Sequence, residues 1–174
     1  STQGQWGIVE NNLWITIEAF IIAYIASTVL GIGVALIFSM SERIEKAIMP
    51  IMIAGNSVPR VSLAPLLLFY FGVAFLAPLL TAWIAFFPMF MSAFEGFSKV
   101  DEDLQDLLAT LDATRIQEYR YIRLPNSIPY IFDGMRVSLT LAATGTIVAE
   151  FVATNGGIGY LAFFAMQNFM IPLL

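Results

Sequence analysis

The stretch LWITIEAFIIAYIASTVLGIGVALIF, residues 13–38, decides the fold class, because it is long and apolar enough to cross a bilayer as one helix. A membrane-spanning helix needs about 20 mostly apolar residues, and Glu18 is the only charged residue in this stretch. Residues 48–71, 75–94 and 128–153 meet or approach the same requirement. The sequence therefore predicts an all-α, polytopic membrane helix bundle, in which residues 1–174 form a single transmembrane domain with four spans.

The composition supports this class. Hydrophobic residues make up 59% of the 174 residues and charged residues 12%, whereas an ordinary soluble domain has roughly 45–50% apolar and about 25% charged residues. One core at this chain length cannot hide so much apolar surface from water. The excess must face lipid, or other apolar protein within the bilayer.

Several kinds of chemistry are missing from the chain. It contains no Cys and no His, which removes thiolate nucleophiles, the usual zinc ligands and the commonest general base. Lys46 and Lys99 both lie outside any G-x-x-x-x-G-K-[ST] phosphate loop. We therefore expect no catalytic residue, no metal and no cofactor, and we expect a protein that is not an enzyme.

The basic residues outside the predicted spans predict the orientation. They lie in two loops on the same side of the four spans: Arg43, Lys46, Lys99, Arg115, Arg120 and Arg123. Residues 1–12 and 154–174 contain no Lys or Arg. Cytoplasmic loops carry the excess of basic residues. We therefore expect a multi-pass protein of the cell membrane, with residues 95–127 cytoplasmic and both ends of the chain extracytoplasmic.

The long loop has a helical pattern of its own. Leucines at 104, 107, 108 and 111 recur at helical spacing, and apolar residues at 116, 119 and 122 continue in a similar register. This pattern predicts two short amphipathic helices with a bend near Asp112. Proline disfavours helix in the residue before it, so Leu124-Pro125 is expected to end the second helix. The plain alternative is a surface loop whose leucines pack on the ends of the spans.

The stretch DLLATLDATRIQEYRYIRLP, residues 106–125, resembles the EAA loop of binding-protein-dependent ABC permeases. The family pattern reads E-A-A, three residues, G, nine residues, I, any residue, L-P. The matching positions here, in order, are Asp106, Leu107, Leu108, Asp112, Ile122, Leu124 and Pro125. The stretches NSVPRVSLAPLLLFYFGV, AFFPMFMSAFEGFSKVD, LPNSIPYIFDGMRVSLTLA and IVAEFVATNGGIGYL also look like this family. Together they are similar to the branch that imports nitrate, taurine, aliphatic sulfonates and pyrimidine- or riboflavin-type compounds.

The resemblance implies a type I ABC importer permease fold and a set of partners. In that family the EAA loop docks into a cleft on a cytoplasmic ATPase subunit, so the matched residues and Ala113 become the expected ATPase-coupling residues. The resemblance further implies an ATPase dimer that hydrolyses ATP, a second permease subunit (expected to be a copy of this chain) and an extracytoplasmic solute-binding protein. The binding protein would dock near NGGIGYL, which we interpret as a flexible outward turn. No nucleic acid partner is expected.

The chain departs from the family pattern at three kinds of position. Asp112 replaces a glycine that accepts positive φ freely, and aspartate reaches that region at some cost. Asp106 shortens the family's glutamate by one methylene. Leu107 and Leu108 are larger than the alanines they replace, so the cleft that receives them must differ.

A few polar residues in the spans mark a candidate translocation path. The sequence GNSVPR contains Asn56, Ser57 and Arg60 around a proline break, and broken helices are tolerated against protein or a water-filled cavity. Arg60 would suit an anionic solute, or it could snorkel or pair with a carboxylate of a neighbouring subunit. Glu150 is expected toward the outward end of its span, near water, with a path or gating role. The expected solute is small, such as a sulfonate, taurine, nitrate or a pyrimidine-like compound.

Two other functional classes remain open from the residues. A secondary transporter driven by an ion gradient would need an essential membrane carboxylate, such as Glu18 or Glu150, and no ATPase. A membrane scaffold without transport activity would tolerate the loss of the embedded charges and of Pro59 and Pro65. Neither class accounts for the colinear family motifs.

Overall fold

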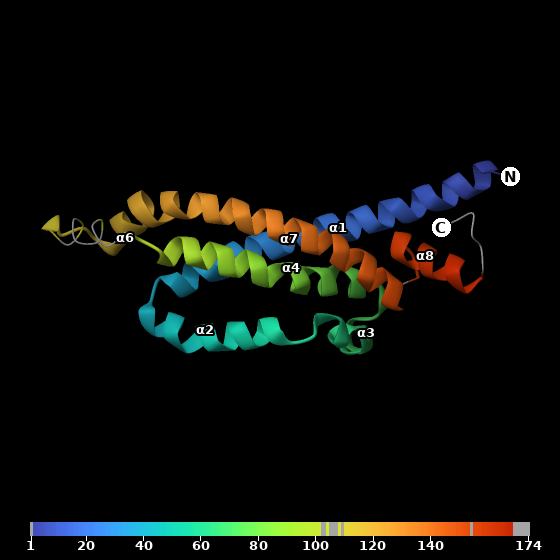
Figure 1. Ribbon diagram of the computed structural model, residues 1–174, viewed down its shortest axis with the longest axis horizontal. Coiled ribbons are helices and arrows are strands. Elements are labelled where there is room, and N and C mark those ends of the chain that lie inside the picture. Colours follow the sequence, from blue (N-terminus) through green and yellow to red (C-terminus); the bar gives the residue numbers. More distant parts are fainter. Residues whose placement is uncertain (1, 102–103, 105–107, 109, 154, 169–174) are drawn as a thin grey trace. The chain divides into compact units, whose positions relative to one another are not determined.

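A computed structural model of the protein describes residues 2–101, 104, 108, 110–153 and 155–168. Within these residues the chain is helical and contains no strand. The elements follow one another as α1 (Thr2–Ser39), α2 (Glu42–Ser57), η1 (Arg60–Leu63), α3 (Ala64–Phe71), α4 (Val73–Ser98), α6 (Arg115–Glu118), η2 (Tyr119–Arg123), α7 (Leu124–Ala153) and α8 (Ile158–Gln167) (Figure 1).

Three helical stretches are long and apolar enough to cross a membrane, namely Trp6–Ser39, Val73–Ser98 and Arg115–Val152. A fourth span is present if Lys46–Ser57 and Arg60–Phe71 are the two halves of one broken span. Pro59, in an extended conformation, separates those halves. The structure thus confirms the all-helical class, and it places the expected break in the second span.

The helix expected to end at Leu124-Pro125 continues instead. Residues 115–152 form one helical stretch, and its first turns widen into the π-helical segment η2. The Leu124 N–H bonds to the Tyr119 carbonyl, five residues earlier, at the end of that segment. In α-helical geometry a proline ring clashes with the carbonyl four residues before it. The wider π turn relieves this contact, so Pro125 is accommodated within a continuous helix.

The chain divides into two compact units, which we describe separately. The first comprises residues 1–27, 58–85 and 139–174. Its core is formed by Leu76, Leu80 and Ile84 of α4 and Ala149 of α7, with Ala19 of α1 packed against them. Inside this unit the buried hydroxyls of two threonines, at 81 and 146, hydrogen-bond at 3.2 Å.

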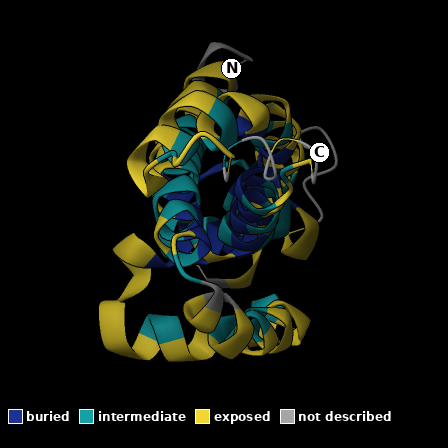
Figure 2. Ribbon diagram, turned by 90° about the vertical axis from the view of Figure 1, so that its left-hand side faces the viewer, coloured by how far each residue is buried: buried dark blue, intermediate teal, exposed yellow. Residues whose placement is uncertain are grey.

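The second unit comprises residues 28–57 and 86–138. Its core is a row of phenylalanines on α4, of which Phe90 stacks on Phe86 and Phe94 with ring centroids 5.9 and 5.7 Å apart. Small residues bring α4 and α7 close together, since a Cβ on Gly96 would lie 2.9 Å from the Ser127 Cα. Exposed positions, yellow in Figure 2, include many large apolar side chains of the helices, as expected for surfaces that face lipid or other membrane protein.

Candidate functional site

The residues matched to the EAA loop lead into a sharply defined turn in the second unit. Asp112 has φ of 49°, so it adopts the positive φ expected of the residue that replaces the family's glycine. The Ala113 N–H bonds back to the Leu108 carbonyl at 3.2 Å. Thr114 then starts α6 with a capping box, in which its side chain and that of Gln117 bond each other's backbone N–H. We call residues 110–127 the coupling segment, because they overlap the stretch that is expected to couple to an ATPase.

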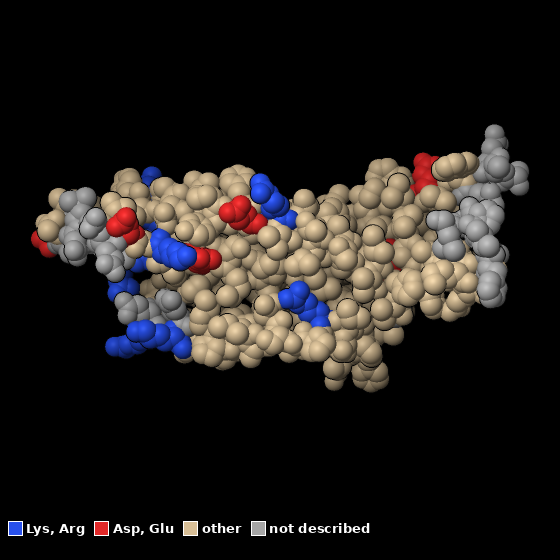
Figure 3. Space-filling view, in the orientation of Figure 1, with Lys and Arg blue, Asp and Glu red and all other residues tan. Residues whose placement is uncertain are grey.

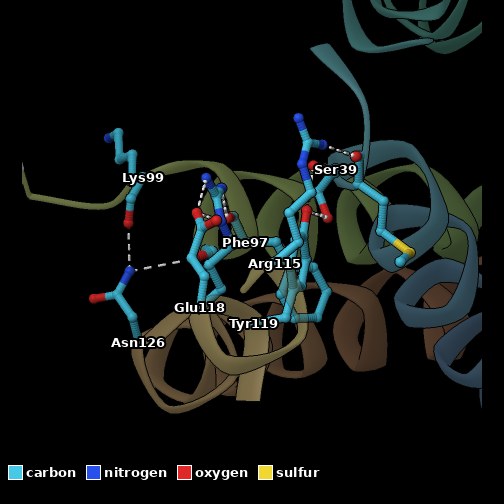
Figure 4. A network of polar contacts seen from close by, with 10 residues as sticks. Ser39, Phe97, Lys99, Arg115, Glu118, Tyr119 and Asn126 are labelled. Carbon is cyan, nitrogen blue, oxygen red and sulfur yellow. Dashed lines mark hydrogen bonds and ion pairs between the residues drawn. The ribbon is translucent and has the colours of Figure 1, made fainter. Parts of the chain in front are cut away.

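The coupling segment is bonded to the C-terminal end of α1. The Arg115 Nη1 donates to the Met40 carbonyl at 3.1 Å, and the Tyr119 hydroxyl donates to the Ser39 carbonyl (Figure 4). The last carbonyls of a helix lack partners within the helix, and arginine is a favourable partner for them. These two side chains therefore close the end of α1.

A second group of bonds joins the coupling segment to the end of α4. The Arg123 Nη1 donates to the Phe97 carbonyl at 2.7 Å, and the Asn126 Nδ2 donates to the Gly96 carbonyl at 3.2 Å (Figure 4). The guanidinium of Arg123 also pairs with the Glu118 carboxylate at 2.6 Å. The same guanidinium lies 5.2 Å from the ring centroid of Tyr119.

The side chains that make these bonds are Arg115, Tyr119, Arg123 and Asn126. None of them belongs to the residues that the EAA pattern marked. Arg and Asn are common partners of helix ends, but the sequence does not show which helix end they will meet. Only the folded chain brings carbonyls near residues 39 and 97 to side chains near residues 115–126.

The expected ATPase-coupling residues are partly described. Asp106 and Leu107 lie outside the described residues. The remaining ones divide by exposure: Leu108, Ala113 and Ile122 are half-buried, and Asp112, Leu124 and Pro125 are exposed. Two apolar neighbours are also exposed, since Leu111 is 68% and Ile116 79% accessible. The coupling segment thus presents apolar side chains outward, which distinguishes it from a loop whose leucines all pack on the span ends.

The expected path residues fall into different units. Asn56 and Ser57 are exposed at the end of α2, and the Ser57 hydroxyl bonds its own helix at the Ile53 carbonyl. Arg60 is half-buried and begins η1. Glu150 belongs to the same unit as Arg60.

Glu150 is more enclosed than a carboxylate near the end of a span is expected to be. Its side chain is only 1% exposed. One carboxylate oxygen accepts hydrogen bonds from the Gly159 N–H and from the Thr16 hydroxyl, both at 2.9 Å. The side chain lies at the start of α8, whose backbone N–H groups lack partners within the helix. A carboxyl group at that position satisfies one of them.

The NGGIGYL segment is held more firmly than a flexible turn would be. The Gly157 N–H bonds to the Asn12 Oδ1 at 2.8 Å, and the Ile158 N–H bonds to the Thr16 Oγ1 at 2.8 Å. Gly157 has φ of 102°, and a Cβ there would lie 2.2 Å from the Glu150 Cδ. Glycine is therefore required at 157 for both its conformation and its lack of a side chain. The turn is fixed to α1 and α7 by side chains.

Comparisons with known proteins bear on the family and the fold of the chain. The profile of the family described as binding-protein-dependent transport system inner membrane component matches residues 27–174. The chain is 29% identical over 158 residues to the formylaminopyrimidine transport permease protein ThiX of Halalkalibacterium halodurans, covering 90% of this chain and 63% of that protein. It is 33% identical over 132 residues to the riboflavin transport system permease protein RibX of Chloroflexus aurantiacus, covering 75% and 49%. It is 30% identical over 162 residues to the putative aliphatic sulfonates transport permease protein SsuC of Bacillus subtilis, covering 92% and 59%.

A solved structure shows the same fold. A chain of the MetNI methionine ABC transporter, in an inward-facing conformation, matches with a TM-score of 0.77 at 14% identity, covering 99% of this chain and 90% of that chain. The present chain spans less than two thirds of the length of the three relatives named above. Because the family profile matches most of its residues, the chain belongs to the family of binding-protein-dependent transport system inner membrane components.

Proposed function

We propose that the chain is the membrane-spanning permease subunit of an ABC-type importer. It forms half of a solute translocation pathway and couples to a separate ATPase through residues 106–125. Its conformational change follows the binding and hydrolysis of ATP on that partner. The chain itself supplies no covalent chemistry.

The observation that carries this proposal is the bonding of the coupling segment to two spanning helices. A soluble ATPase can do work on a membrane pathway only through an element that both parts hold. Residues 115–126 are held by side-chain bonds to the ends of α1 and α4, and they continue directly into α7. A displacement of this segment is therefore transmitted to three helices at once. The exposed Leu111 supplies an apolar contact for the partner.

The family suggests the proposed partners, and the basic residues of the loops suggest the proposed orientation. An ATPase dimer contacts residues 95–127 on the cytoplasmic side, and a second copy of the chain completes the pathway. A solute-binding protein docks on the opposite side, where both ends of the chain lie. The turn at 155–159 belongs to this outward side.

The proposed solute is a small organic or inorganic compound. The names of the relatives point to formylaminopyrimidine, riboflavin and aliphatic sulfonates as their solutes. Two further relatives are named as taurine and nitrate permeases. We propose Asn56, Ser57 and Arg60 as path residues, because they flank the break between α2 and η1. For Glu150 we propose an indirect part in the pathway, in which it positions α8.

A crosslinking experiment tests the coupling. These 174 residues contain no Cys, so Leu111→Cys gives this region a single thiol, exposed in the coupling segment, and the protein is studied in native membranes. A short thiol crosslinker and mass spectrometry then identify the attached protein. Met166→Cys is the matched control, since Met166 is 55% exposed on α8.

An ATPase with a phosphate loop should be the main adduct at position 111 and absent at position 166. If position 111 is labelled from the cytoplasm and captures no ATPase, the coupling assignment fails. A gradient-driven transporter would then be the better interpretation.

A further inference from the structure

An apolar groove lies beside the coupling segment in the second unit. Its volume is about 450 Å³, within the range of small-molecule sites. Its walls come from the end of α1 and from residues 115–124. The lining residues are Leu36, Met40, Arg115, Ile116, Tyr119, Arg120 and Leu124.

The groove lies where two spanning helices leave the apolar layer. Leu36 belongs to the last turn of the span Trp6–Ser39, and Met40 directly follows that span. The other wall belongs to the start of the span Arg115–Val152. Three of the wall side chains are exposed, namely Met40 at 54%, Ile116 at 79% and Leu124 at 42%. The groove is thus open to molecules at the border between hydrocarbon and water.

Two guanidinium groups line this groove, and its described lining residues include no carboxylate. Arg115 donates to a neutral carbonyl, and Arg120 lies 6.0 Å from the centroid of the Tyr121 ring. Within the described part of the chain, neither arginine forms an ion pair, whereas Arg123 is neutralised by Glu118. Figure 3 shows basic side chains at the start of α2, and basic and acidic side chains together near α6. Among the described residues, the groove therefore combines apolar walls with two guanidinium groups that form no ion pair.

We propose that this groove binds an anionic phospholipid. The headgroup phosphate is bound by Arg115 and Arg120, since guanidinium groups match phosphate oxygens in geometry and charge. The start of an acyl chain lies along the apolar wall near Ile116 and Leu124. Basic pockets between spanning helices on the cytoplasmic side are suited to anionic headgroups.

The position of the groove favours a lipid over a protein as the occupant. One wall reaches into the last turn of a spanning helix, so this part of the groove is expected to lie at the edge of the bilayer. The inference requires that the spans lie in a bilayer, and it does not depend on an ATPase partner. It adds a lipid requirement to the segment that we propose for coupling.

Native mass spectrometry of the full-length protein tests the proposal. The protein is incubated with palmitoyl-oleoyl phosphatidylglycerol and, separately, with palmitoyl-oleoyl phosphatidylcholine. We expect a tighter-binding site for phosphatidylglycerol. Arg120→Gln removes one basic contact and should weaken phosphatidylglycerol binding about fivefold. This factor corresponds to about 1 kcal/mol for one basic residue near a lipid surface. Ile116→Ser should weaken it as well, because acyl-chain contact is lost.

Arg43→Gln is the matched control, since Arg43 is exposed in the same unit and lies outside the groove. It removes the same charge and should leave the site unchanged. If Arg120→Gln and Arg43→Gln weaken phosphatidylglycerol binding equally, the lipid is attracted to basic residues in general. That result would overturn the proposal. Unchanged phosphatidylglycerol binding in Arg120→Gln and Ile116→Ser, together with a loss of ATPase binding, would make the groove a protein-docking surface and would also overturn it.

Discussion

Alanine at position 157 should strongly destabilise the first unit. Residue 157 has φ of 102°, and a non-glycine residue in such a conformation costs about 1–3 kcal/mol. Its Cβ would lie 2.2 Å from the Cδ of Glu150, a side chain that is only 1% exposed. If the carboxyl group moves away, its bonds to Gly159 and Thr16 are lost, at about 0.5–1.5 kcal/mol each. We therefore expect Gly157→Ala to lower the free energy of unfolding by about 4 kcal/mol.

Gly33→Ala is the matched control for this substitution. Gly33 lies within α1, and a Cβ there meets nothing within 4 Å, so alanine should raise the free energy of unfolding by about 0.5–1 kcal/mol. The assay is an SDS titration of the full-length protein in mixed micelles, followed by far-UV circular dichroism.

A double variant separates the two costs of alanine at 157. In a Glu150→Ala background, Gly157→Ala should cost only the conformational part, about 2 kcal/mol, so the two substitutions should be non-additive. Equal stability of the Gly157→Ala and Gly33→Ala variants would refute the close contact. Full additivity in the double variant would show that Glu150 is not the group that the Cβ meets.

Substitutions at three further positions test the coupling segment. Arg123→Gln removes the ion pair with Glu118 and the bond to the Phe97 carbonyl, so it should lower the free energy of unfolding by about 2–4 kcal/mol and reduce solute uptake in cells. Tyr119→Phe loses one hydroxyl bond to the end of α1 and should cost about 1 kcal/mol in the same SDS titration. Asp112→Ala should be about 1 kcal/mol less stable than Asp112→Gly, because alanine tolerates φ of 49° less well than glycine; equal stability of the two would contradict the turn.

The spans could be predicted from the sequence because bilayer thickness imposes a simple rule. A run of apolar residues long enough to cross is helical, since the backbone must satisfy its own hydrogen bonds in lipid. The break at Pro59 was predictable as well, because the missing N–H and the fixed φ of proline are local properties of the sequence. The positive φ of Asp112 followed from the glycine at the matching family position.

Local rules failed where distant residues decide the outcome. The rule for residues before proline predicted a helix end at Leu124, but η2 widens the turn and the helix continues. A carboxylate near the end of a span is expected to seek water, yet Glu150 is buried because Gly159 and Thr16 supply its donors. Thr16 precedes Glu150 by more than a hundred positions, and no periodicity in the chain indicates that the two meet.

The helix ends described above share one physical solution. The first N–H groups and the last carbonyls of a helix lack partners within the helix, and the bilayer core offers them no water. The ends of α1 and α4 are closed by Arg115, Tyr119, Arg123 and Asn126, and the start of α8 is closed by side chains of α1 and α7. Each of these bonds joins two different elements, so neither element can slide past the other without exposing a polar group. A force on the coupling segment therefore acts on the backbone of α1 and α4 directly, and not only through the packing of apolar side chains.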